Sequence, residues 1–169
     1  MRKIAQFSKV SERQFTQDFC AAYPGAGQEE AKEIYENITL PKRATRGSAG
    51  YDIYTPVPYT LKPGESARIP TGIRVKIEDG WFLSVFPRSG LGFKFRLQLD
   101  NTVGVIDSDY YFAENEGHIF VKVTNDSKEG KTVVLEAGKA FCQGIFLEYG
   151  ITVDDETEGI RVGGLGSTS

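Results

Sequence analysis

The pattern of apolar and polar residues divides the chain into a helical N-terminal part and a longer part built from short strands. A first strand is predicted over residues 2–10, after which Phe15 and Phe19 recur at the i, i+4 spacing of a helix. Ser11 is placed to cap the N-terminus of that helix. A second helix is predicted over residues 28–36. Both helices are expected to be structural, because neither carries a catalytic set of side chains.

From residue 38 onward, short apolar runs alternate with Pro and Gly, a pattern that is typical of β-sandwiches and barrels. The 19 Gly, 11 Phe and 8 Tyr also favour a turn-rich β fold over a helical bundle. We therefore expect a mainly β fold. The predicted strands cover residues 48–54, 59–61, 66–69, 72–76, 81–86, 95–99, 118–124, 132–135 and 140–149.

Length and charge limit the classes of function. A chain of 169 residues suits one domain over residues 1–169, and a net charge of −3 offers no broad basic surface for nucleic acid. No apolar run approaches the length of a membrane span. Cys20, Cys142 and the single His118 lack metal-ligand spacing. We expect a soluble cytoplasmic protein with reduced cysteines, or a viral or phage protein that acts in the host cytoplasm.

The segment Leu99–Tyr110 places three Asp residues within an apolar run, although an unpaired carboxylate is costly to bury. Such a local conflict is typical of a functional site. Asp107 is the best candidate for a general base, and Tyr110 offers a ring face for stacking on a sugar or base. Asn101 and Gly104 predict the turn of a β-hairpin whose edge groups could contact a flat ligand. The alternative that these Asp residues only build turns stays open on this segment alone.

Other polar residues stand at strand ends. Arg88, Ser89 and Gly90 follow the apolar run WFLSVF and could grip phosphate oxygens through a guanidinium, a hydroxyl and a free N–H, although a plain surface turn would have the same sequence. Asp52 could hold a metal-bound water, pair with an Arg, or be a buried structural residue. Gln143 lies in the apolar run AFCQGIFL and needs a hydrogen-bond partner if it is buried.

The C-terminal part is rich in charge and then in glycine. Acidic residues at 154–158 predict a solvated linker, and residues 154–169 are expected to form a mobile arm. The Gly-rich end after Arg161 could wrap phosphates with its N–H groups, or it could simply be a flexible end.

Five stretches, AGYD, PRSG, NTVGVIDSDY, the strand with Gln143 and RVGGLGST, resemble in order and spacing the five motifs of the trimeric dUTP diphosphatase (dUTPase) family. The resemblance runs from about residue 44 to the C-terminus. It implies a distorted jelly-roll (β-clip) fold and a homotrimer whose active sites are shared between subunits. It also implies Mg²⁺-dependent hydrolysis of dUTP to dUMP and pyrophosphate, which limits uracil in DNA and supplies dUMP for dTMP synthesis.

The resemblance also implies a role for each matched residue. Asp107 would be the general base, Tyr110 would pack under the deoxyribose, and Asn101 with the backbone at Gly104 would read uracil. Asp52 would contact the magnesium ion through water. The phosphates would be held by Arg88, Ser89, Gly90 and Gln143, and by the closing arm with Arg161, Leu165, Gly166, Ser167 and Thr168.

Several features depart from the family pattern. Leu165 stands where the family usually has a Phe over the uracil ring, and Arg161 is one residue closer than usual to the glycines. A helical insertion at 11–37 and a second insertion at 111–116 have no counterpart in the pattern. Both insertions could lie near a subunit edge or at the mouth of the site.

Three other functions are weighed against this one. A dCTP deaminase or a bifunctional deaminase–diphosphatase would share the fold and the trimer, but VGVIDSDY resembles the diphosphatase form. A binding module could keep the fold and contact a protein through the insertions. A purely structural β-domain would have no need for the whole set of polar residues.

Overall fold

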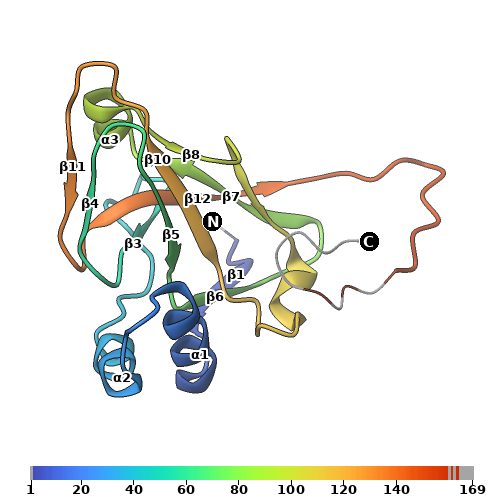
Figure 1. Cartoon of the computed structure of the whole chain (residues 1–169). Helices are drawn as coiled ribbons and strands as arrows, with labels where there is room; N and C mark the ends of the chain where they lie inside the picture. Colours follow the sequence, from blue (N-terminus) through green and yellow to red (C-terminus); the bar gives the residue numbers. More distant parts are fainter. Residues whose placement is uncertain (1, 160, 162, 164–169) are drawn as a thin grey trace.

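The computed structural model describes residues 2–159, 161 and 163, and its largest sheet has five antiparallel strands (Figure 1). Its strands, in spatial order, are β2 (Lys42–Arg43), β3 (Tyr51–Tyr54), β12 (Ala140–Glu148), β7 (Trp81–Pro87) and β9 (Gly104–Ile106). Arg88 follows the last residue of β7, and Asp107 follows the last residue of β9. Because these two strands are antiparallel, the sheet carries candidate residues at both ends.

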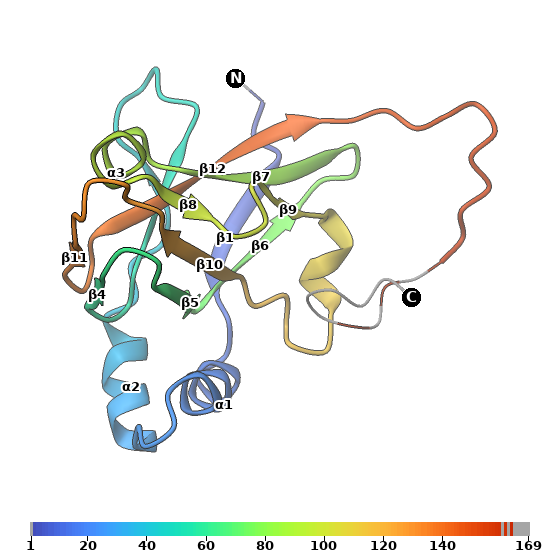
Figure 2. The ribbon, with the colours of Figure 1, turned by 45° about the horizontal axis from the view of Figure 1, so that its top comes forward.

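Three smaller antiparallel sheets complete the β structure (Figure 2). One contains β5 (Ser66–Pro70), β10 (Phe120–Asn125) and β8 (Leu97–Leu99) in that order. The other two are the pairs β1 (Ala5–Lys9) with β6 (Ile73–Ile77), and β4 (Tyr59–Leu61) with β11 (Val133–Leu135). The mainly β fold predicted from the turn-rich sequence is confirmed.

The strands form because apolar side chains alternate along them and share one core. Val121 and Val123 on β10 are buried while Lys122 between them is exposed, which is the two-residue period of a strand with one face inward. Leu83 and Phe141 are 0% exposed. Full burial of a side chain of this size contributes roughly 1.5–3 kcal/mol.

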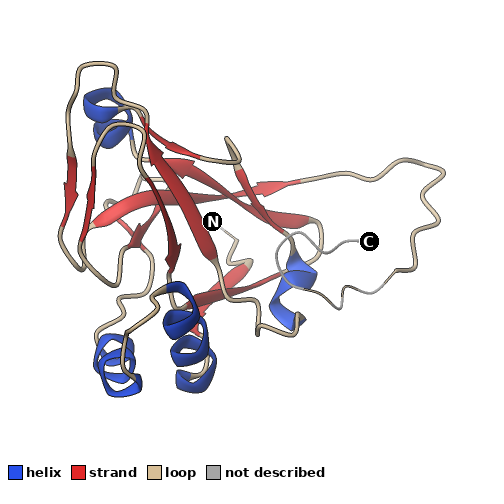
Figure 3. Cartoon of the chain, viewed as in Figure 1, coloured by secondary structure: helices blue, strands red, loops and turns tan. Residues whose placement is uncertain are grey.

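Two helices, α1 (Glu12–Ala22) and α2 (Gln28–Glu36), lie on the side of the sheets away from α3 (Ser89–Phe95) (Figure 3). The Ser11 hydroxyl accepts a hydrogen bond from the Gln14 N–H, so the predicted cap is confirmed. Phe15, Phe19 and Ala31 are buried within the same core cluster as the strands. Both helices therefore pack into the core of the domain.

Two short helices were not predicted. Helix α3 occupies a stretch where a turn at Arg88–Gly90 and a strand from Phe95 were predicted. Its two glycines are poor helix formers, so the sequence does not mark a helix there. The helix ends at Arg96, whose φ of 52° is left-handed. The 3₁₀ helix η1 (Ser108–Phe112) begins directly after Asp107, in a stretch for which no helix was predicted.

The predicted hairpin between residues 99 and 104 is wrong. Strand β8 pairs with β10, and β9 pairs with β7, so the turn at residues 100–103 carries the chain from one sheet to another. The physical reason is burial: Leu97 and Leu99 face the core from one sheet, and Ile106 faces it from the other. Strands β8 and β9 are each the outermost strand of their sheet, so the backbone beside this turn still lies at sheet edges.

Beyond β12 the chain runs away from the sheets and returns toward η1 (Figure 1). The acidic residues 154–158 are exposed, as expected for a solvated linker. The end of the arm, for which mobility was predicted, lies outside the described residues. It includes Leu165, Gly166, Ser167 and Thr168. Among the described residues, no helix has the length and apolar character needed to cross a membrane.

Candidate functional site

The first group of candidate residues, the Arg88 cluster, comprises Asp52, Arg88, Ser89, Gly90 and Gln143. Strand register builds it, because Gln143 lies opposite Asp52 on β3 and opposite Phe86 on β7. Arg88 follows the last residue of β7. These residues line a hollow of about 760 Å³.

Hydrogen bonds fix the polar side chains of the Arg88 cluster. The Arg88 guanidinium lies 3.0 Å from the Asp52 carboxylate and also donates to the Ala140 carbonyl at 3.3 Å. The Gln143 amide donates to the Pro87 carbonyl at 3.2 Å. Asp52 is thus paired with an Arg, which was one of the alternatives considered from the sequence. Gln143 has the hydrogen-bond partner that its partial burial requires. Ser89 and Gly90 open α3 beside them and face the same hollow.

Gly50 makes room for the Gln143 side chain. A Cβ atom at position 50 would lie 2.3 Å from Gln143 Oε1, so any larger residue would displace the amide. The glycine in the AGYD stretch is therefore required by the position of the Gln143 side chain, which β12 brings next to β3.

The second group, the Asp107 cluster, comprises Asp107, Asp109 and Arg161. Asp107 caps η1 with extended backbone angles, and its side chain is 48% exposed, so water reaches the carboxylate. Arg161 donates to Asp107 at 2.6 Å and to Asp109 at 2.9 Å. The Arg161 side chain is only 12% exposed, which makes this pair of contacts a firm anchor for the returning arm.

Tyr110 is buried beneath the Asp107 cluster and is 3% exposed. Its hydroxyl donates to the His118 carbonyl at 2.7 Å, and burial raises the pKa of this hydroxyl. The Arg161 guanidinium lies 5.8 Å from the centre of the ring. The open ring face expected from the sequence is therefore covered by Arg161 in this conformation.

The third group lies at the turn between β8 and β9. Asn101 and Gly104 line a hollow of about 330 Å³, together with apolar residues that include Val85 and Leu99. A Cβ atom on Gly104 would lie 3.0 Å from Val85 Cβ, so the backbone at Gly104 approaches β7 closely. Arg68 also lines this hollow, and sequence analysis missed it because nothing near Arg68 in the chain marks it.

The Arg88 and Asp107 clusters lie at opposite ends of β7. Leu83 pairs with Ile106, so Asp107 is level with Phe82, whereas Arg88 follows the other end of the strand. Six residues of extended chain separate these levels by about 20 Å. A triphosphate chain is shorter than this backbone separation, which argues against contact of both clusters of one chain with the phosphates of a single nucleotide.

The donor set suits a metal ion that arrives with a phosphate chain. Among the described residues, no group of three or more His, Cys, Asp and Glu side chains could hold a metal. Asp52 is a single carboxylate that is paired with Arg88. Magnesium commonly binds through one or two carboxylates, waters and substrate phosphates, and this arrangement fits that mode better than a cage made of protein alone.

Comparisons with known proteins agree on one family. A family model described as dUTPase matches residues 36–168. The deoxyuridine 5′-triphosphate nucleotidohydrolase of Lactococcus lactis subsp. lactis is 42% identical over 139 residues, which cover 79% of this chain and 91% of the relative. The protein of the same name from Finegoldia magna is 41% identical over 140 residues, which cover 78% of this chain and 92% of the relative.

Solved structures show the same fold. The dUTPase of Streptococcus mutans is 42% identical, with a TM-score of 0.61 over 69% of this chain and 90% of that chain. The dUTPase from phage phi11 of S. aureus is 20% identical, with a TM-score of 0.63 over 94% of this chain and 99% of that chain, a likeness that shows the fold alone. The family match begins at residue 36, so β1, α1 and nearly all of α2 precede it.

Proposed function

The chain belongs to the dUTPase family, and from that membership we propose that it hydrolyses dUTP to dUMP and pyrophosphate. The observation that carries the proposal is the water-accessible Asp107 carboxylate directly before η1, which shares Arg161 with Asp109 and precedes the buried Tyr110 in the chain. We further propose that residues 1–169 act as one unit on free nucleotides in the cytoplasm, without a nucleic-acid or membrane partner.

Asp107 is proposed to act as the general base. Its carboxylate takes a proton from a water molecule, the water oxygen bonds to the α-phosphorus, and the bond from that phosphorus to the bridging oxygen breaks to release pyrophosphate. In this structure Arg161 pairs with Asp107 and Asp109. Phosphate oxygens that attract the guanidinium would free Asp107 to accept the proton, so binding of the triphosphate prepares the base.

The Arg88 cluster is proposed to hold the phosphate chain. Arg88 supplies a fixed guanidinium, Ser89 a hydroxyl, Gly90 an unobstructed N–H and Gln143 an amide, all facing one hollow. Magnesium bound to the triphosphate would neutralise phosphate charge, with Asp52 as its contact through water.

The hollow at Asn101 and Gly104 is proposed to hold uracil. Backbone groups of the turn between β8 and β9 would pair with the polar edge of the base, and cytosine would be rejected because its donors and acceptors are reversed. Tyr110 would pack under the deoxyribose once Arg161 has moved from its ring. Arg161, Leu165, Gly166, Ser167 and Thr168 are proposed to close over the bound nucleotide.

A complete site is proposed to need more than one copy of the chain, as in a homotrimer. The separation of the two clusters along β7 supports this, since Asp107 of one copy and Arg88 of another would have to meet. Alternating apolar residues after β12 support it as well: Tyr149 is 46% exposed and Ile151 is 75% exposed. A second copy would cover this apolar edge.

The first test measures pyrophosphate release from dUTP, dCTP, dTTP and UTP, with Mg²⁺ and with a chelator. We expect turnover of dUTP alone, at a rate that falls sharply with the chelator and returns with added Mg²⁺. Ammonia release from dCTP would favour the deaminase function instead. A folded protein without turnover of any nucleotide would favour the binding module.

The second test mixes two inactive variants, Asp107→Asn and Arg88→Ala, after unfolding and joint refolding. If each site takes these residues from different copies, about a quarter of all sites in an equal mixture, or about a third of those in mixed trimers, regain both residues. The unmixed variants, refolded in the same way, are the controls. Activity that does not rise above the controls, although mixed trimers form, would contradict the shared site.

A further inference from the structure

The two segments that lack a counterpart in the family pattern contact each other. Ser11, which caps α1, donates from its backbone N–H and from its hydroxyl to the Glu116 carboxylate, each at 2.7 Å. Arg74 on β6 donates to the Tyr111 carbonyl at 2.9 Å, and its guanidinium lies 3.6 Å from the centre of the Tyr111 ring. The loop at residues 111–116 is therefore held by both the helical segment and the sheet.

His118 extends this contact into the core. Its side chain is 0% exposed, and Nδ1 lies 2.6 Å from the Asp18 carboxylate on α1. The Gly72 N–H donates to Nε2 at 2.8 Å, so Nε2 is the acceptor and Nδ1 carries the proton toward Asp18. Burial acts to raise the pKa of Asp18, but hydrogen bonds from His118 and Gln14 outweigh it and hold the pKa below its usual value.

The same loop holds Tyr110 by its hydroxyl. That hydroxyl donates to the His118 carbonyl at 2.7 Å and accepts from the Asn115 amide at 2.8 Å. The Asn115 side chain is fixed in turn, because its Oδ1 accepts from the Gly117 N–H at 3.2 Å. Gly117 has a φ of 71°, and a Cβ atom there would lie 2.7 Å from the Tyr110 carbonyl oxygen. The turn therefore wraps directly around the Tyr110 backbone.

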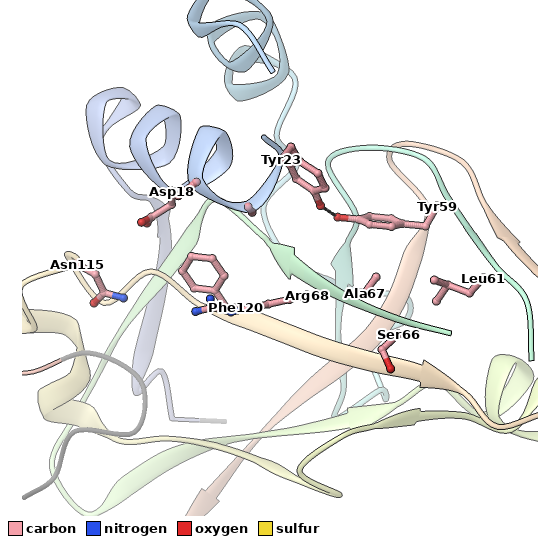
Figure 4. Close-up of a pocket in the computed structure, with 11 residues that line it drawn as sticks. Asp18, Tyr23, Tyr59, Leu61, Ser66, Ala67, Arg68, Asn115 and Phe120 are labelled. Carbon is pink, nitrogen blue, oxygen red and sulfur yellow. Dashed lines mark hydrogen bonds between the residues drawn. The ribbon is translucent and has the colours of Figure 1, made fainter. Parts of the chain in front are cut away.

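We propose that Asn115, His118 and Asp18 are positioning residues, which set the depth of Tyr110 and with it the start of η1 at Asp107. The inference rests on the proposed function, in which Tyr110 packs under the sugar. Figure 4 shows Asp18 on α1 and Asn115 on the loop at the same end of a hollow, beside Phe120, while Tyr23 and Tyr59 lie at the other end. The added helix α1 thus contributes to sugar selection from outside the family match.

The two hydrogen bonds of the Tyr110 hydroxyl, here called the clamp, fix the distance between the Tyr110 ring and the sugar. While both bonds are made, the space above the ring is fixed, so a 2′-OH would meet the ring. Release of one bond lets the ring shift, and displacements of about 1 Å near a reacting centre can cost about 10²-fold in rate. Because a ribose gains from the added space while a deoxyribose loses its support, the preference for dUTP over UTP should fall.

The experiment compares Asn115→Ala, Asp18→Ala and Asp18→Asn with wild type. Two quantities are measured: the ratio of kcat/KM for dUTP to that for UTP, and amide hydrogen exchange of residues 107–112 without nucleotide. We expect the ratio to fall about tenfold or more in both Ala variants, with faster exchange. Asp18→Asn should restore both quantities, because its amide oxygen still accepts from Nδ1.

Tyr35→Phe is the matched control. It removes a 2.7 Å hydrogen bond from the Tyr35 hydroxyl on α2 to the Val10 carbonyl shortly before α1, without touching Tyr110. We expect lower stability with unchanged selectivity. The proposal is overturned if exchange at 107–112 or the nucleotide ratio stays at the wild-type value in both Ala variants, or if Tyr35→Phe lowers the ratio equally. If the wild-type protein does not hydrolyse dUTP, the proposed function is overturned. Hydrogen exchange of residues 107–112, measured without nucleotide, still shows whether Asn115 and Asp18 hold Tyr110 in place.

Discussion

Asp107→Asn is expected to lower kcat for dUTP by about 10²–10⁴-fold, because the amide cannot take a proton from the attacking water. The side chain keeps its size, and Arg161 keeps Asp109 as a partner at 2.9 Å, so KM should change little. Single-turnover measurement of pyrophosphate release would separate the chemical step from product release.

Asp109→Asn is the matched control for this variant. Asp109 lies two residues further along η1 and pairs with the same guanidinium, but it does not hold the proposed base position. We expect its kcat to stay within about tenfold of wild type, because the Asp107 carboxylate and its own contact with Arg161 remain. Equal losses in the two variants would show that the carboxylates act by anchoring Arg161 rather than by proton transfer.

Phe15→Ala is expected to lower the free energy of unfolding by about 3–5 kcal/mol, the usual cost of emptying a buried aromatic position. Phe15 is 0% exposed, and its ring centre lies 5.5 Å from that of Phe19 and 6.1 Å from that of His118. The substitution therefore removes one of the contacts that join α1 to the core. Urea unfolding followed by circular dichroism gives the change directly.

Phe93→Ala provides the comparison, since the same side chain is 91% exposed on α3. Its effect should stay within about 0.5 kcal/mol of zero. A loss below about 1 kcal/mol for Phe15→Ala would mean that the helical segment is an appendage whose contacts are not part of the cooperative core.

The periodic part of the fold could be predicted from the sequence. Strand β4 and helix α2 have the predicted bounds, because turn residues and caps mark both of their ends. The 3₁₀ helix at Ser108–Phe112 could not be predicted, because a single turn after an apolar run has no period to detect. The hairpin prediction failed because each flanking strand is too short to show which sheet will bury it.

The chemistry of the candidate site was also visible in the sequence, but its geometry was not. Asp107, Arg88 and Gln143 stand out because their polar groups interrupt or follow apolar runs. Their separation by the length of β7 depends on strand register, which no local pattern gives. The role of His118 was missed as well, because Asp18 lies 100 residues away in the chain and neither residue has a distinctive neighbour.

Because the two clusters lie at opposite ends of β7, the proposed activity should depend on the concentration of the chain. An isolated chain would hold its base and its phosphate cradle too far apart to serve one nucleotide, so under the proposed shared site the activity per chain would fall on dilution as copies dissociate. A nucleotide bridging two copies would oppose that dissociation, because it binds only the assembled form. The substrate would thereby stabilise the assembly that consumes it, and the protein concentration in the cell would set how much of the chain is active.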